Sequence, residues 1–244
     1  MNLKSVEKVI SVPGFINQNG DVFNKIFVPF LISDLSKFSL GNNIFIFFGS
    51  KGQGKSYFMK YYSNNLEAYG ANNLIINRNH KHNIDRLLDK DDKSKKITML
   101  FIDGIEHMLS DENQYNISTF EIIKSLSMES DFPIVIVVRD LNKISNYISS
   151  FVSIDFDLID FVDVFDIVSH MTKNIEIYNI SNREDALYFV SENLYNKYRT
   201  RFEIVNILRK ILNISYEQFV YDNKDINNPS LKIDYYTIKS ILSK

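Results

Sequence analysis

Short apolar runs separated by longer polar stretches dominate the first part of the chain. The four clearest runs cover residues 44–48, 73–76, 97–102 and 134–138. Apolar and polar positions hardly alternate within them, which is typical of strands covered on both faces of a parallel sheet. Between the runs, apolar residues recur at helical spacing over 57–69 and 114–128. Strands that alternate with helices predict an α/β fold with a three-layer arrangement.

The pattern changes near residue 180. A short apolar segment at 174–178 predicts a fifth strand of the parallel sheet, after a mixed and mainly helical stretch over 141–170. Helices are expected later over 181–198, 201–213, 215–222 and 234–242, and earlier over 22–38 and 83–89. Ser181 and Glu184 have the spacing of a capping box, which marks a helix start. We therefore predict an α/β domain over residues 1–178 and a small all-helical domain over 179–244.

Composition narrows the classes of function. The chain has 244 residues, a formal net charge of −2 and no cysteine. A nearly neutral chain has no global field that attracts nucleic acid or an anionic membrane, so we do not expect direct nucleic-acid binding. Without cysteine there are no disulfides or thiolate metal sites, which suits the reducing cytoplasm. No apolar run approaches the roughly 20 residues that span a bilayer. We expect a cytoplasmic protein without a membrane partner.

The strongest chemical signal follows the first predicted strand. Residues 49–56 contain the complete G-x-x-x-x-G-K-S pattern, placed between a strand and a helix as a phosphate-binding P-loop requires. Backbone N–H groups of such a loop curl around a phosphate, and the helix N-terminus favours the same anion. Lys55 would reach the β- and γ-phosphates, and Ser56 would hold Mg²⁺. The predicted contacts to ATP or ADP come from Gly49, Ser50, Lys51, Gly52, Gln53, Gly54, Lys55 and Ser56.

A carboxylate at the end of the third run carries the next signal. Asp103 is expected to hold Mg²⁺ through water beside Ser56, although an aspartate here could instead cap a helix or a turn. Gly104 takes the position where many P-loop ATPases have a water-activating carboxylate. Either Glu106, two residues further on, is the catalytic base, or the base is missing and hydrolysis is slow. We favour slow hydrolysis.

Acidic residues recur among apolar ones later in the chain. They are Asp155, Asp157, Asp160, Asp163 and Asp166. Their spacing resembles the solvated side of an amphipathic segment more than a metal cluster. The pair His80 and His82 is a weak metal signal as well, so we expect no metal site at either place.

Taken in chain order, these blocks resemble the AAA+ module of the bacterial replication initiator (DnaA) group. The similarity is greatest to the short Hda-type regulatory relatives, which lack the initiator's DNA-binding domain. After the P-loop, residues 100–106 are similar to the Walker-B block, 134–138 to the sensor-1 strand, 181–194 to the first lid helix and 231–242 to the last. The resemblance extends over most of the chain from about residue 40 onward.

The resemblance implies a P-loop NTPase core followed by a helical lid, with the nucleotide between them. It also implies a regulator of chromosomal replication initiation that acts through nucleotide-dependent protein association. The implied partners are the replication initiator or the sliding clamp, and the implied assembly is a nucleotide-dependent oligomer. Arg201 is the best match to the arginine that contacts the phosphates from the lid, although the register also permits Phe202.

Departures from the family pattern point to weak catalysis. His170 stands where the family carries an arginine finger, and histidine is shorter and mostly neutral at pH 7. The sensor-1 strand ends in Arg139 without a clear small polar residue, and the clamp-binding motif is not visible in residues 1–20. With Gly104, these departures predict an ATP- or ADP-binding regulator with weak or no hydrolysis. The alternatives are an active ATPase that remodels a partner, with Glu106 as base, and a structural module that binds no nucleotide.

Overall fold

The computed structural model describes residues 11–27, 43–68, 71–77, 99–106, 132–145, 148, 150–222 and 232–243. By packing, the chain divides into two compact units. Met1–Val12 and Asn17–Asp157 form the first, here called the sheet unit, and Pro13–Ile16 and Leu158–Lys244 form the second, called the helical unit. The helices expected over 83–89 and 114–128 lie outside the described residues.

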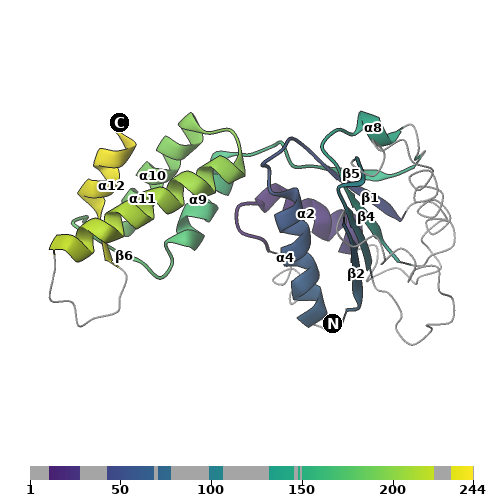
Figure 1. Cartoon of the computed structure of the whole chain (residues 1–244), viewed down its shortest axis with the longest axis horizontal. Helices are drawn as coiled ribbons and strands as arrows, with labels where there is room; N and C mark the ends of the chain where they lie inside the picture. The colour runs from purple at the N-terminus through teal and green to yellow at the C-terminus, as the bar shows by residue number, and fades with distance from the viewer. Residues whose placement is uncertain are drawn as a thin grey trace. The chain divides into compact units, whose positions relative to one another are not determined.

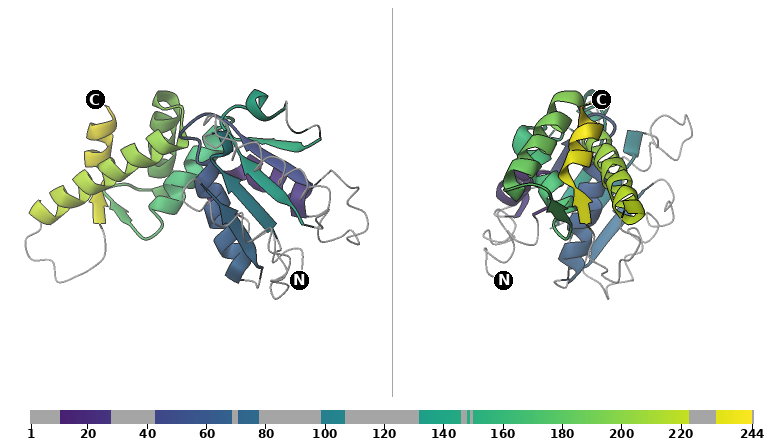
Figure 2. Two further views of the ribbon diagram at one scale, coloured as in Figure 1. Left: turned by 45° about the vertical axis from the view of Figure 1, so that its right-hand side comes forward. Right: turned by 90° about the vertical axis from the view of Figure 1, so that its left-hand side faces the viewer.

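The sheet unit is built on a five-stranded parallel sheet (Figure 1). Its strands are β1 (Ile44–Phe48), β2 (Asn73–Ile76), β3 (Met99–Asp103), β4 (Ile134–Val137) and β5 (Val152–Asp155). Their order is β2-β3-β4-β1-β5, and every neighbouring pair is parallel. Helix α4 (Lys55–Ala68) runs alongside the strands (Figures 1 and 2). The predicted α/β class with a five-stranded parallel sheet is confirmed.

Shorter helical segments with described bounds also lie before residue 150. They are α2 (Ile16–Val22), the π-helical turn η1 (Phe23–Phe27) and α8 (Asn142–Ser145). The helix predicted over 22–38 therefore begins earlier, at Ile16, and its residues after Phe27 lie outside the described part of the chain.

The fifth strand differs from the prediction. It lies at Val152–Asp155, within a stretch expected to be mainly helical, and pairs with β1. The strand predicted at 174–178 belongs to a separate small sheet. Val152, Ile154 and Phe156 alternate with polar residues, which is typical of an edge strand with one buried face. This alternation is the signal from which the strand can be predicted.

Aromatic side chains fill the space between α4 and the sheet. Phe58 of α4 packs edge-on against Phe47 of β1 and against Phe156 beyond β5, with ring centroids 5.7 and 5.2 Å away. One turn later, the ring of Tyr62 lies 6.2 Å from that of Phe101 in β3. Burying one such ring stabilises the fold by about 1.5–3 kcal/mol. This layer holds α4 against β1 and so positions both ends of the loop that joins them.

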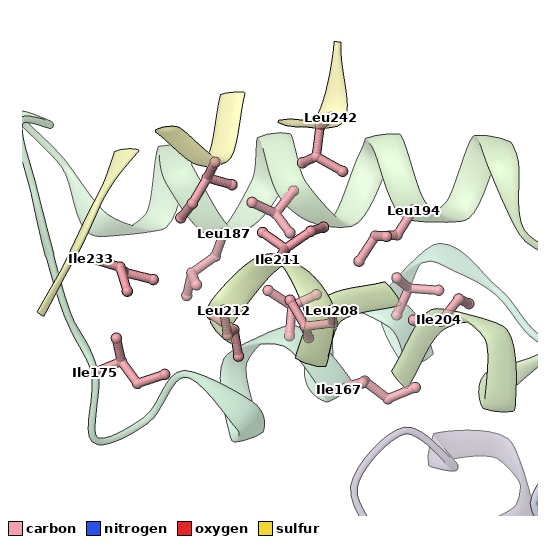
Figure 3. Packing of buried hydrophobic residues seen from close by; sticks show 14 residues of the cluster. Ile167, Ile175, Leu187, Leu194, Ile204, Leu208, Ile211, Leu212, Ile233 and Leu242 are labelled. Atoms are coloured by element: carbon pink, nitrogen blue, oxygen red, sulfur yellow. The ribbon is translucent and has the colours of Figure 1, made fainter. Parts of the chain in front are cut away.

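The helical unit combines helices with a small sheet. Its described elements are α9 (Phe161–Met171), β6 (Glu176–Tyr178), α10 (Arg183–Lys197), α11 (Arg201–Asp222), β7 (Lys232–Asp234) and α12 (Tyr235–Leu242). Isoleucine and leucine side chains from these elements pack into one core (Figure 3). The prediction of an all-helical domain is wrong in one respect, because β6 and β7 pair as a two-stranded parallel sheet.

Helix α11 is longer than the sequence pattern suggests. Two helices are predicted over 201–213 and 215–222, where the structure has one continuous helix. The segment contains no glycine or proline, so no residue in it strongly disfavours continued helical hydrogen bonding. Among the described residues, neither α11 nor any other helix is both long and apolar enough to cross a membrane.

The packing divides the chain after Asp157, whereas the sequence pattern changes after residue 178. Helix α9 lies between these two points. Its side chains Val164, Ile167 and Val168 are buried in the core of the helical unit. Packing therefore assigns α9 to the helical unit.

Candidate functional site

The residues of the predicted P-loop lie in the turn between β1 and α4. Strand β1 ends at Phe48, and the Phe58 N–H donates to the Gly54 carbonyl at 2.8 Å in the first turn of α4. Gly49, Gly52 and Gly54 have φ angles of 142°, 91° and 80°. Residues other than glycine rarely adopt such angles. The predicted strand–loop–helix context is thus present, and its backbone requires these three glycines.

Lys55 is the first residue of α4, and only 7% of it is exposed. Its Nζ donates to the carbonyl oxygens of Gly49 and Ser50, the latter at 2.8 Å. Burial lowers the pKa of the Lys55 ammonium, because poorly solvated surroundings disfavour its charge. The carboxylate of Asp157 has the largest effect in the opposite direction. The loop therefore wraps around its own ammonium group.

The other loop residues differ in their exposure. Ser56, the predicted Mg²⁺ ligand, is half-buried in the first turn of α4. Gln53 is buried, whereas Ser50 and Lys51 are exposed. Lys55 is thus the basic side chain that this turn encloses, and Lys51 extends from its surface.

Asp103 and the loop are brought to the same edge of the sheet. Strand β4 lies between β3 and β1, and Val137 is in register with both Asp103 and Phe47. Neighbouring strands are about 4.8 Å apart, which places Asp103 roughly 10 Å from Phe47 across the sheet. Asp103 and Glu106 both favour the charged form of Lys55 electrostatically. The predicted catalytic and Mg²⁺-binding carboxylates therefore lie near the predicted phosphate-binding lysine.

Gly104 and Glu106 have structural roles in the turns at this edge. Gly104 has a φ of 79°, so its backbone itself favours glycine. Oε1 of Glu106 accepts the backbone N–H groups of Arg139 and Asp140 at 2.7 and 2.8 Å. These bonds hold the turn that follows β4. A role of Glu106 as catalytic base stays a prediction.

Asp157 touches the loop, although the sequence pattern places it only on a solvated face. Its Oδ1 accepts the Ser50 N–H at 2.6 Å. A Cβ added to Gly49 would lie 3.1 Å from the backbone N of Asp157 and 3.2 Å from the same oxygen, a tight contact that adds to the backbone angle in favouring glycine. The contact arises because β5 pairs with β1, and a strand order of this kind cannot be predicted from local spacing.

Arg201 lies in the helical unit at the start of α11, with only 3% of it exposed. Its Nη2 pairs with Oδ2 of Asp163 at 2.6 Å and donates to the Leu158 carbonyl at 3.0 Å. Its Nε donates to the Gly14 carbonyl at 2.6 Å, and its Cζ lies 4.4 Å from the centre of the Phe15 ring. All of these contacts belong to the helical unit. A contact of Arg201 with nucleotide phosphates stays a prediction.

Asp163 is fully buried, in contrast to the solvated face predicted for this acidic series. Its Oδ1 accepts the Ile16 N–H at 2.8 Å, and Oδ2 of Asp166 accepts the Gly14 N–H at 2.7 Å. Burial raises the pKa of the Asp163 carboxyl, and the charge of Arg201 opposes this shift. The acidic residues of α9 and Arg201 thus bind a short segment near the N-terminus.

We call Pro13–Ile16, Asp163, Asp166 and Arg201 together the N-terminal anchor. Glycine is needed at position 14, where φ is 78° and an added Cβ would lie 2.3 Å from Cγ1 of Ile167. A Pro-Gly dipeptide at 13–14 indicates a turn in the sequence. The sequence does not indicate which residues bind this turn, because Gly14 and Asp166 are 152 positions apart.

The fold and the site define the class of protein at a coarse level. It is an α/β protein with a five-stranded parallel sheet and flanking helices, compatible with a P-loop fold. The chain matches no protein-family model, and no curated protein matches it. Its function is therefore inferred from the loop at residues 49–56 and its surroundings.

Proposed function

We propose that this chain is an AAA+ nucleotide-binding protein that binds ATP or ADP at residues 49–56 and regulates a partner by nucleotide-dependent association. The observation that carries this proposal is the loop between β1 and α4, where three glycines at positive φ accompany a buried Lys55. Such a loop offers backbone N–H groups and the N-terminus of a 14-residue helix to an anion.

The residues at this sheet edge suit Mg²⁺. Ser56 offers a hydroxyl and Asp103 a carboxylate, and Mg²⁺ prefers hard oxygen donors of this kind. Ser56 would bind the ion directly and Asp103 through water, and the bound ion would neutralise part of the phosphate charge. Lys55 would add positive charge once its Nζ leaves the carbonyl oxygens of Gly49 and Ser50.

Three observations support weak or absent hydrolysis. Gly104, at the position of the usual catalytic carboxylate, has a φ of 79°, where a longer residue would be strained. Oε1 of Glu106 already accepts two backbone N–H groups. His170, at the arginine-finger position, is an exposed residue in the last turn of α9, and its side chain is shorter than that of arginine. We therefore assign regulation to nucleotide binding, with turnover close to background.

The proposed role in chromosomal replication initiation rests on the resemblance to the DnaA group and its Hda-type relatives. In this role the helical unit is the lid, and the partner is the replication initiator or the sliding clamp. Gel filtration of the purified protein with each partner, with and without ADP or ATP, tests this part separately. If the elution volume of neither partner changes in any nucleotide state, this role fails, while the proposal of nucleotide binding still stands.

Lys55→Ala is expected to lower the affinity for ADP and ATP at least tenfold, because it removes the cation that faces the phosphates; loss of one charged hydrogen bond alone accounts for about this factor. Lys60→Ala is the matched control, since Lys60 is an exposed lysine of the same helix. Isothermal titration calorimetry measures both, with phosphate release followed in the same samples. Unchanged affinity in Lys55→Ala would sink the proposal. Rapid turnover that Glu106→Gln abolishes would instead favour the active ATPase.

A further inference from the structure

A carboxylate from a neighbouring strand is held against the P-loop backbone. Asp155 at the end of β5 is in register with Phe48 at the end of β1, so Asp157 follows β5 beside the start of the loop. Oδ1 of Asp157 accepts the Ser50 N–H at 2.6 Å. The N–H of Asp157 donates to Oδ1 of Asp155 at 2.8 Å. The first bond holds the Asp157 carboxylate against the loop, and the second fixes the backbone of Asp157.

The position of this carboxylate is unfavourable for a bound phosphate. Among the charged groups that act on the Lys55 ammonium, Asp157 has the largest effect. A nucleotide would bring several negative charges to the same ammonium and the same loop. Repulsion between like charges several ångströms apart, at an intermediate effective dielectric constant, changes a binding constant about tenfold.

The same carboxylate contributes to the resting arrangement of the loop. Lys55 Nζ donates to the carbonyls of Gly49 and Ser50, while the Ser50 N–H donates to Asp157. The peptide group between Gly49 and Ser50 is thus bound on both sides, its carbonyl by a cation and its N–H by an anion. Because Asp157 is exposed, its side chain can rotate into water when an anion takes its place.

We propose that Asp157 is an intrinsic competitor of the nucleotide phosphates, which keeps the loop closed on Lys55 and sets the affinity for nucleotide. The inference rests on the proposed function, since it requires that residues 49–56 bind phosphates. Binding then displaces the carboxylate from the Ser50 N–H and releases Lys55 from the loop carbonyls. The resting protein is a self-inhibited form of the site.

Asp157→Asn separates charge from hydrogen bonding, because its amide oxygen still accepts the Ser50 N–H. Calorimetry with ADP in the absence of Mg²⁺ is expected to show about tenfold tighter binding than wild type at low salt. The gain should shrink in 1 M salt, where charges are screened over about 3 Å. Asp21→Asn, which removes a surface carboxylate paired with Lys25, is the matched control and should leave the affinity unchanged.

Asp157→Ser gives a second variant without the charge, and thermal unfolding shows which variants are folded. If a folded variant binds ADP and wild type binds none, the result supports Asp157 as a competitor of the phosphates. If wild type binds ADP and the folded variants bind equally or more weakly, Asp157 instead positions the loop, and the inference falls while the proposed function stands. If neither wild type nor any folded variant binds ADP, both fall together.

Discussion

Two aspartates of one acidic series have opposite surroundings. Asp163 is fully buried and paired with Arg201, whereas Asp157 is exposed and bonded to the Ser50 N–H. A buried charge that loses its partner stays uncompensated, because water cannot replace that partner. An exposed charge that loses its partner is solvated instead. We therefore assign a structural role to Asp163, whereas the exposed Asp157 side chain can exchange its protein partner for water.

Arg201→Met is expected to lower the free energy of unfolding by about 3–5 kcal/mol, because it leaves the Asp163 carboxylate buried without its partner. Lys25→Met is the matched control, since it breaks the surface pair between Lys25 and Asp21. That loss should be about 0–1 kcal/mol. Urea denaturation followed by circular dichroism measures both variants. Similar losses of stability in the two variants would show that the buried pair contributes no more than the surface pair.

The burial of single charged residues could not be predicted from the sequence. Asp157 and Asp163 follow the same alternation of acidic and apolar residues, and no local feature distinguishes them. The partner of Asp163 lies 38 positions further along the chain, and the loop residue that Asp157 contacts is 107 positions earlier. The loop between β1 and α4 could be predicted because its sequence pattern is contained in eight consecutive residues.

At the scale of elements, the N-cap of helix α10 is not the residue that the sequence spacing suggests. The S-x-x-E spacing points to Ser181, but Asn182 is the N-cap, and its side chain accepts the Glu184 N–H at 3.0 Å. Asn182→Ala should lower the free energy of unfolding by about 1 kcal/mol. Ser181→Ala, at an exposed position, should change it by less than about 0.5 kcal/mol. Thermal denaturation measures the stability of both variants. A larger loss of stability for Ser181→Ala would show that Ser181 is the N-cap.

The strands in the interior of the sheet could be predicted because of one physical property. β1 and β4 are buried almost throughout, so their residues form uninterrupted apolar runs. β5 is half-buried at most positions and lies at the sheet edge, so its residues alternate and resemble part of an amphipathic segment. β6 has only three residues, and α10 and α11 separate it in sequence from its partner β7. The assignment of such a strand to a sheet depends on contacts distant in sequence.

At the scale of the whole molecule, the helical unit is discontinuous in sequence. It takes Pro13–Ile16 from the N-terminal part of the chain, while the rest of the unit begins at Leu158. The Gly14 carbonyl and the Phe15 ring both contact Arg201. A polypeptide that starts at residue 158 therefore lacks part of the surroundings of its own buried arginine.

We expect a polypeptide of residues 158–244 to be less stable than the same unit in the intact chain, and to be stabilised by a synthetic peptide of residues 11–20. The control peptide carries Gly14→Ala, whose added Cβ would lie 2.3 Å from Cγ1 of Ile167 at a φ of 78°. Differential scanning calorimetry should show a rise in Tm with the first peptide and none with the second. Equal shifts would mean that the anchor is not specific.

Residues 13–16 of the N-terminal anchor are, in thermodynamic terms, a ligand that the protein carries for itself. Covalent attachment presents such a ligand at an effective concentration on the order of millimolar, so even a segment of modest intrinsic affinity stays bound. Occupancy is then independent of protein concentration but open to competition. Any molecule that captures residues 13–16 would have to displace them from Arg201 and Asp163. The stability that the helical unit loses in this displacement would lower the affinity of that molecule.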